Sequence, residues 1–347
     1  MGWGQGIAWD GAGEGESCVA GILKVVANPV TTHDVGAVAA DGAAAARRHT
    51  LVSDYVALMK VRVSTMVVIT AGAGYYLGAL RSGISPWQMG MVQALGGIAV
   101  VTCGAGALNQ ALERKTDGRM RRTADRPMAA GRIGLAHGLA LGFAAIIAGS
   151  VWLALATNMI TGTLTLLTAL GYVGIYTPLK RMTTLNTFVG AFPGALPPLV
   201  GWTAARGMIE WPAVALFAIL FVWQFPHFMA IGWMYREDYA RAGIRVTAVG
   251  DKNGSASVVQ ALFYAVVMIP VSVWPYWLGM TGRVYGVAAV LLGVGYLWYT
   301  VRFAGIVRTQ NASVSRGLAR DLLKASVIYL PLLLAAMMLN AAGKIGY

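Results

Sequence analysis

Charged side chains are scarce in this chain: they make up 12% of its 347 residues, whereas 57% are hydrophobic. A soluble domain of this length could not cover so much apolar surface with so few charges. Cysteine is scarce as well, with Cys18 near the N-terminus and Cys103 inside an apolar run. That placement excludes a disulfide framework. The composition therefore predicts an integral membrane protein.

The apolar residues are gathered in segments long enough to cross a bilayer as helices. These segments cover about residues 63–80, 88–112, 134–154, 159–178, 184–205, 212–234, 258–279, 284–302 and 322–341. The expected fold class is all-α, a polytopic membrane protein with about nine transmembrane helices.

Positive charge is distributed unevenly between the two sides of this predicted bundle. With a cytoplasmic N-terminus, all but four of the 27 lysines and arginines lie on the cytoplasmic side; the exceptions are Arg81, Arg206, Arg283 and Lys344. Cytoplasmic loops of membrane proteins are enriched in these residues. We therefore expect a multi-pass protein of the bacterial cytoplasmic (inner) membrane, with its N-terminus on the cytoplasmic side. The net charge of +13 fits anionic lipid headgroups and a phosphorylated substrate, and we expect no nucleic-acid partner.

Residues 1–50 differ from the rest of the chain. They are rich in glycine and alanine, contain five acidic residues and show no sustained apolar period. Such a composition is typical of disorder. We expect a disordered cytoplasmic extension over 1–50, followed by one transmembrane domain over 51–347.

Acidic residues are rare after residue 50, and two short stretches hold most of them. In the first, Asn109, Glu113 and Asp117 are spaced four residues apart, which places them on one face of a helix. A carboxylate pair without a lysine on the same face is a poor salt bridge but a suitable oxygen site for Mg²⁺. Arg122 and Arg126 follow, and guanidinium groups bind phosphate well. The stretch predicts a site for a metal-bound diphosphate. In the alternative interpretation, these arginines only mark a cytoplasmic loop.

The second stretch follows the sixth apolar segment and contains Arg236, Glu237, Asp238 and Tyr239. Adjacent residues on a helix point about 100° apart, so only one of the two acids is expected to bind a metal directly. The alternative is that both pair with Arg236 and Arg241 at the membrane surface. His227, two turns inside the segment, either contacts an intramembrane ligand or hydrogen-bonds a neighbouring helix.

Three prolines, Pro193, Pro197 and Pro198, interrupt the fifth apolar segment. They predict a kinked or locally unwound helix that borders the substrate chamber.

Several of these motifs resemble the haem O synthase (protohaem IX farnesyltransferase) branch of the UbiA-type intramembrane prenyltransferases. The first acidic stretch, continued by Met120, Arg122, Thr123, Arg126 and Pro127, is similar to the first aspartate-rich motif of that family. Three further runs resemble the branch in the same order: Tyr176–Arg181, Gly190–Trp202 and Trp223–Phe228. Arg236, Glu237, Asp238, Tyr239 and Gly243 complete the pattern. The sequence departs from it at Glu113, at Val61 and in lacking a carboxylate four residues after Asp238.

The resemblance implies nine helices around a central cavity, and transfer of farnesyl from farnesyl diphosphate to a vinyl group of haem B with addition of water. It implies Mg²⁺ held by Asn109, Glu113, Asp117, Glu237 and Asp238, with the first three and Asp238 taking part in catalysis. Substrate binding would then fall to Arg122, Arg126, Lys180, Arg181, His227, Arg236 and Tyr239. The farnesyl channel would be lined by Trp202, Phe225, Phe228 and Trp233. Downstream haem-modifying enzymes or oxidase assembly factors would be partners.

Two alternatives remain open from the residues. A UbiA-type enzyme that prenylates a quinone or chlorin precursor would share the metal site but not the histidine-containing run. A transporter would also contain many apolar helices, but it would be expected to hold polar residues near the middle of the bilayer.

Overall fold

The computed structural model describes residues 49–309 and 311–341. The predicted disordered extension therefore lies outside the described residues except for its last two positions, as does Cys18. The helices run as α2 (Leu51–Leu58), α3 (Val61–Arg81), α4 (Met89–Asp117), α5 (Leu135–Ala156), α6 (Met159–Leu170), η1 (Gly171–Tyr176), α7 (Thr177–Leu179), α8 (Asn186–Ala195), α9 (Pro197–Arg206), α10 (Trp211–Met234), α11 (Arg236–Ala242), α12 (Thr247–Gly250), α13 (Ser255–Trp277), α14 (Arg283–Phe303), η2 (Ala304–Val307) and α15 (Ala312–Leu339).

Within these residues, eight helical segments are long and apolar enough to cross a membrane. They match eight of the nine predicted segments, because a chain in a bilayer satisfies its backbone hydrogen bonds most readily as a helix. The remaining predicted segment, the fifth in chain order (184–205), forms the two shorter helices α8 and α9. The all-α fold class is confirmed, and the expected count of about nine crossings is roughly consistent with these eight segments.

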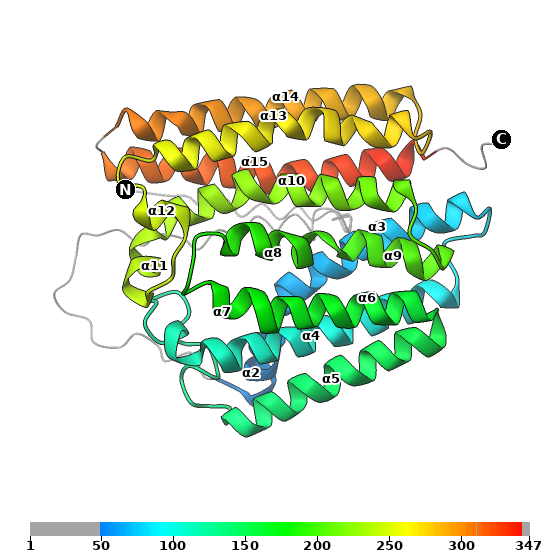
Figure 1. Ribbon diagram of the computed structural model, residues 1–347, viewed down its shortest axis with the longest axis horizontal. Helices are drawn as coiled ribbons and strands as arrows, with labels where there is room; N and C mark the ends of the chain where they lie inside the picture. Colours follow the sequence, from blue (N-terminus) through cyan, green and yellow to red (C-terminus); the bar gives the residue numbers. More distant parts are fainter. Residues whose placement is uncertain (1–48, 310, 342–347) are drawn as a thin grey trace, which may run out of the picture. The chain divides into compact units, whose positions relative to one another are not determined.

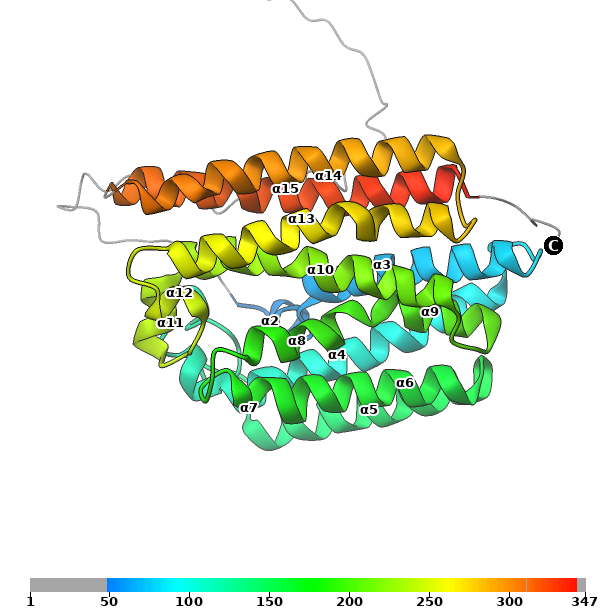
Figure 2. The same cartoon turned by 45° about the horizontal axis from the view of Figure 1, so that its top comes forward.

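Helices that follow one another in the chain pack side by side (Figures 1 and 2). One group contains α4, α5 and α6, a second contains α10, α13, α14 and α15, and α3, α8 and α9 lie between them. The short helices α11 and α12 lie at one end of the bundle, which we call the polar end. Four basic residues also lie at this end: Arg114 in the last turn of α4, Arg122 against Tyr235, Lys180 after α7 and Arg241 in α11.

The kink predicted in the fifth segment is confirmed. Pro197 and Pro198 have no N–H group, so two carbonyls of the preceding turn lose their helical donors. Gln224 of α10 ties α8 to its neighbour, since its Nε2 donates to the Ala191 carbonyl at 3.1 Å. The kinked pair also crosses α3 at backbone contact: a Cβ atom on Gly201 would overlap the carbonyl oxygen of Ala71. Glycine is required there by the close approach.

A π-helical turn, η1, separates α6 from α7. The sequence prediction treated this region as one uninterrupted helix. In a π turn the chain contains one residue more than an α turn, and one carbonyl is left for another donor. Thr177 reinforces the turn, because both its backbone N–H and its Oγ1, the latter at 2.9 Å, donate to the Tyr172 carbonyl. The turn thereby fixes the direction of Thr177 and of the residues that follow it.

Candidate active site

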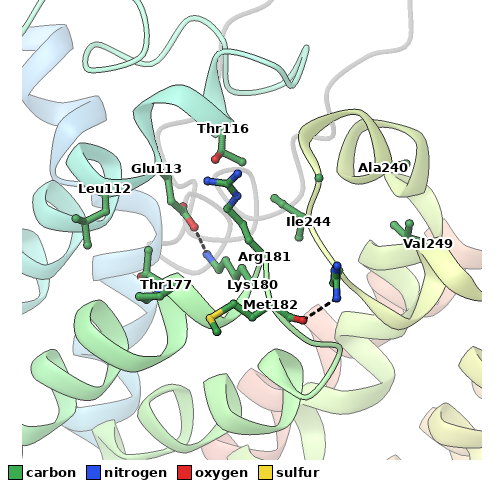
Figure 3. A pocket seen from close by; sticks show the side chains of 13 residues that line it. Leu112, Glu113, Thr116, Thr177, Lys180, Arg181, Met182, Ala240, Ile244 and Val249 are labelled. Atoms are coloured by element: carbon green, nitrogen blue, oxygen red, sulfur yellow. Dashed lines mark hydrogen bonds and ion pairs between the residues drawn. The ribbon is translucent and has the colours of Figure 1, made fainter.

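A cavity of about 700 Å³ opens at the polar end of the bundle. Its walls come from α4, from the segment after α7 and from the α11–α12 region (Figure 3). It is lined by Leu112, Glu113, Thr116, Thr177, Pro178, Lys180, Arg181, Met182, Ala240, Gly243, Ile244, Arg245 and Val249. The volume lies in the range of sites that hold small molecules. No residue of α8 or α9 lines it, so the kinked segment does not border this cavity as expected.

The structure places Asn109, Glu113 and Asp117 along the last turns of α4, as predicted. Asn109 is fully buried, and its Nδ2 donates to Thr177 Oγ1 at 3.0 Å. Glu113 accepts a hydrogen bond from Lys180 Nζ at 2.8 Å. Nη1 of Arg126 donates to both oxygens of Asp117, at 2.9 and 2.8 Å. Each of these three predicted metal ligands is therefore tied to a side chain from another part of the chain.

Lysine side chains lie closer to this face of α4 than the sequence indicated. The helix itself offers no lysine there, but Lys60 donates to Asn109 Oδ1 from the start of α3, and Lys180 reaches Glu113 from the segment after α7. The absence of a lysine on the same face of α4 therefore does not leave Glu113 without a lysine partner. Helical spacing describes neighbours on one helix only, whereas these lysines arrive from distant parts of the chain.

Positive charge exceeds negative charge around the cavity. Lys60, Arg126, Lys180, Arg181 and Arg245 lie in or next to it, together with the carboxylates Glu113 and Asp117. Burial lowers the pKa of the Lys60 ammonium, and the charges of Arg126 and Lys180 act in the same direction. Burial alone would lower the pKa of Lys180, but Tyr176 and Glu113 outweigh that effect and raise it. A polyanionic ligand would relieve this excess.

The loop between α4 and α5 is fixed by charged side chains. Arg132 pairs with Asp54 at 3.0 Å and with Asp125 at 3.1 Å. Thr123 Oγ1 donates to the Asp117 carbonyl at 3.0 Å. These contacts hold the arginine-rich loop over the end of α4 instead of leaving it free in solvent.

The two acidic stretches meet at the polar end. The Arg122 guanidinium lies 5.0 Å from the centre of the Tyr235 ring, a distance typical of a cation–π contact. Tyr239 packs on a small apolar cluster formed by Met120, Ala242 and Ile244. The first stretch is therefore in contact with α11, which follows the sixth apolar segment.

The acids of α11 point to different partners, in line with the expectation that they diverge. Asp238 pairs with Arg241 on the same helix, and Glu237 pairs with Arg316 of α15 at 2.9 Å. Arg236 lies 4.3 Å from the centre of the Trp233 ring. Of the predicted site residues, only Glu113, Lys180 and Arg181 line the cavity itself.

Oxygen donors for a metal are concentrated on α4. Within the described ranges, no group of three His, Cys, Asp or Glu side chains is arranged to hold a metal ion. Mg²⁺ in diphosphate sites is nevertheless bound by a few protein oxygens, such as one amide and two carboxylates, while phosphate oxygens and water complete its coordination. Asn109, Glu113 and Asp117 fit this set, whereas Glu237 is directed towards α15.

His227 hydrogen-bonds a neighbouring helix. Its Nδ1 lies 2.7 Å from Ser326 Oγ of α15, and its ring stacks on Trp223 with centroids 4.8 Å apart. It does not line the cavity. The structure thus shows the second of the two contacts considered for this histidine.

Three of the four aromatic residues expected in a farnesyl channel are buried in the interior, and Phe228 is partly buried. Trp202 is buried and donates from Nε1 to Glu210 Oε2 at 2.9 Å, at the end opposite the cavity. Phe225 is buried and stacks on Tyr264. Trp233 donates to Ser315 Oγ at 2.6 Å. Core packing accounts for these three side chains.

Lys60, Thr177 and Arg245 contact the site but are not among the predicted site residues. Thr177 belongs to the Tyr176–Arg181 run, whereas nothing but charge marks Lys60 and Arg245. Lys60 adopts a left-handed backbone conformation with φ of 50°, which is unusual for a residue other than glycine. Strain of this kind at a site is visible only in three dimensions.

The chain resembles known proteins in sequence. The model of the UbiA prenyltransferase family matches residues 67–320. Protoheme IX farnesyltransferase of Koribacter versatilis is 45% identical over 84% of this chain and 94% of its own. The enzyme of the same name from Solibacter usitatus is 41% identical over 84% of this chain and 99% of its own.

Two solved structures have the same fold at low identity. A digeranylgeranylglyceryl phosphate synthase superposes with a TM-score of 0.67 at 18% identity, covering 83% of this chain and 98% of its own. A UbiA homologue from Archaeoglobus fulgidus bound to GPP and Mg²⁺ superposes with a TM-score of 0.58 at 14% identity, covering 82% and 99%. Sequence and fold agree, and the chain belongs to the UbiA prenyltransferase family.

Proposed function

We propose that this protein transfers the farnesyl group of farnesyl diphosphate to a vinyl group of haem B, with addition of water, to give haem O and diphosphate. The observation that carries the proposal is the excess of cations around a cavity lined by Glu113, which lies between Asn109 and Asp117 on one face of α4. The names of the relatives support the choice of haem as acceptor.

The residues of α4 fit a divalent metal. Asn109, Glu113 and Asp117 would hold Mg²⁺, and Asp238 would approach from α11 on the other side. When bound, Mg²⁺ supplies positive charge that neutralises the leaving diphosphate.

The protein's own cations act on the same charge. Transfer begins when the bond between C1 of the farnesyl group and the diphosphate oxygen breaks, and the electron pair leaves with that oxygen. Lys180 and Arg181 line the cavity where this charge would develop. Fixed cations in a partly dehydrated site stabilise such charge without having to reorganise. Lys60 and Arg126, which hold Asn109 and Asp117 in place, position the donors of α4.

Orientation and partners follow from the same proposal. The strongly basic polar end would face the cytoplasm, in the bacterial inner membrane. Farnesyl diphosphate would then enter from the cytoplasmic side. The product would pass to a haem-modifying enzyme or to the assembly of a terminal oxidase.

The test is to incubate membranes containing the protein with haem B, farnesyl diphosphate and Mg²⁺ and to analyse the haems by mass spectrometry. We expect the hydroxyfarnesylethyl product from the wild type and none from Asp117→Asn. Asp321→Asn is the matched control, because Asp321 is a partly exposed acid of α15 that pairs with Arg302 outside the cavity. Absence of the haem product together with prenylation of an added quinone precursor would instead identify the alternative enzyme class.

A further inference from the structure

Arg245 lines the cavity from the wall opposite α4. The chain reaches it through a turn at Gly243, whose φ of 71° is a conformation that glycine adopts without strain. The next residue, Ile244, is buried against Met120 and Ala242. This buried anchor fixes the backbone from which the Arg245 side chain extends.

Three hydrogen bonds tie Arg245 to the segment after α7. Its backbone N–H donates to the Lys180 carbonyl at 2.8 Å, and its own carbonyl accepts from Asn186 Nδ2 at 2.5 Å. Its guanidinium Nη1 donates to the Met182 carbonyl at 3.0 Å (Figure 3). The position of the guanidinium is therefore set by two walls of the cavity at once.

The charge of Arg245 has no carboxylate partner in the part of the chain that the structure describes. Glu113, the acid that lines the cavity, pairs with Lys180, and the recorded ion pairs include neither Arg181 nor Arg245. A guanidinium carries five N–H donors, and the Met182 carbonyl accepts from one nitrogen only. Donors are thus left for a ligand, and phosphate oxygens match their planar arrangement.

We propose that Arg245 is a further substrate-binding residue that grips the diphosphate of the prenyl donor from the wall opposite α4. This inference rests on the proposed function. During transfer, the electron pair of the broken C1–O bond stays on the diphosphate oxygen. Arg245 would stabilise that negative charge and keep diphosphate in place while the prenyl cation reacts, without gaining or losing a proton itself.

The test compares Arg245→Met and Arg245→Lys with Arg308→Met, in the purified full-length protein with Mg²⁺. Arg308 is an exposed arginine of the polar end outside the cavity. The probes are inorganic diphosphate and farnesyl thiodiphosphate, with haem B binding and melting temperature measured on the same samples. We expect Arg245→Met to weaken binding of both probes about ten- to hundredfold, the loss typical of a hydrogen bond to a charged group. Haem B binding should stay unchanged.

The lysine variant separates binding from folding. It keeps a charge and a donor but not the planar fork, so it should recover only part of the affinity. Arg308→Met should bind both probes within about twofold of the wild type. Equal probe binding by wild type and Arg245→Met would overturn the inference and leave the proposed function intact. So would an affinity loss that occurs only with a fall in melting temperature and is absent in Arg245→Lys. A wild type that binds neither probe would overturn both proposals.

Discussion

Removing Arg126 should expose the electrostatic cost of the buried carboxylate at Asp117. The Asp117 side chain is 1% exposed and the Arg126 side chain 26% exposed, and the two are joined by hydrogen bonds of 2.9 and 2.8 Å. Removing one partner of a buried pair leaves the other charge uncompensated, at about 3–5 kcal/mol. With a dependence of about 2–4 °C per kcal/mol, Arg126→Met should lower the melting temperature by on the order of 10 °C.

Magnesium then reports whether Asp117 is a metal ligand. If it is, MgCl₂ should restore part of the stability of Arg126→Met, because the metal replaces the missing guanidinium as counter-charge. The double variant Arg126→Met/Asp117→Asn carries no buried charge at this point. It should melt at a higher temperature than Arg126→Met and respond less to MgCl₂. Thermal unfolding in detergent, with and without MgCl₂, measures all these values. An Arg126→Met protein as stable as the wild type, or an equal Mg²⁺ response in both variants, would refute the reasoning.

Three further predictions concern parts of the molecule outside the cavity. Gly201→Ala should cost about 3 kcal/mol or more of stability, because the new methyl group meets the backbone of α3; a melting temperature equal to the wild type would show that the two helices can separate freely. His227→Ala should lower thermal stability through loss of the bond to Ser326; if haem B titration shows reduced affinity at an unchanged melting temperature, the packing role is wrong and the histidine contacts ligand. The hydrogen bonds from Arg206 lower the pKa of Glu210 in the folded protein. This pair therefore stabilises the fold above the unfolded pKa of about 4.5 and loses its effect as pH falls through the lower folded pKa. Glu210→Gln should flatten the acid limb of a curve of stability against pH, and an unchanged curve would contradict the assignment.

The parts of the fold that follow from local chemistry could be predicted. Apolar runs of bilayer length became helices, and Pro197 and Pro198 broke the fifth segment because proline removes a hydrogen-bond donor wherever it lies. The spacing of Asn109, Glu113 and Asp117 placed them on one helix, since that relation depends only on the rise and twist of the chain.

Relations between helices could not be predicted in the same way. In a membrane protein both the lipid-facing and the protein-facing sides of a helix are apolar, so the sequence period does not show which side faces the cavity. The position of His227 along α10 could be predicted, but for this reason its hydrogen-bond partner, Ser326, could not. Lys60 and Arg245 reach the site from loops, and their contribution depends on how those loops are folded.

The π turn at Gly171–Tyr176 makes the site sensitive to chain length as well as to residue identity. Each residue of an α-helix advances the side-chain direction by about 100°. The π turn takes up one extra residue within a turn, so a single deletion at this point could close it into an ordinary helix with the residues after it kept near their present directions. A second deletion would have no extra residue to remove, and everything after it would rotate by that angle. Thr177 would then turn away from Asn109, and Lys180 from Glu113. Relatives that vary in length should therefore tolerate the loss of one residue in this turn but not of two.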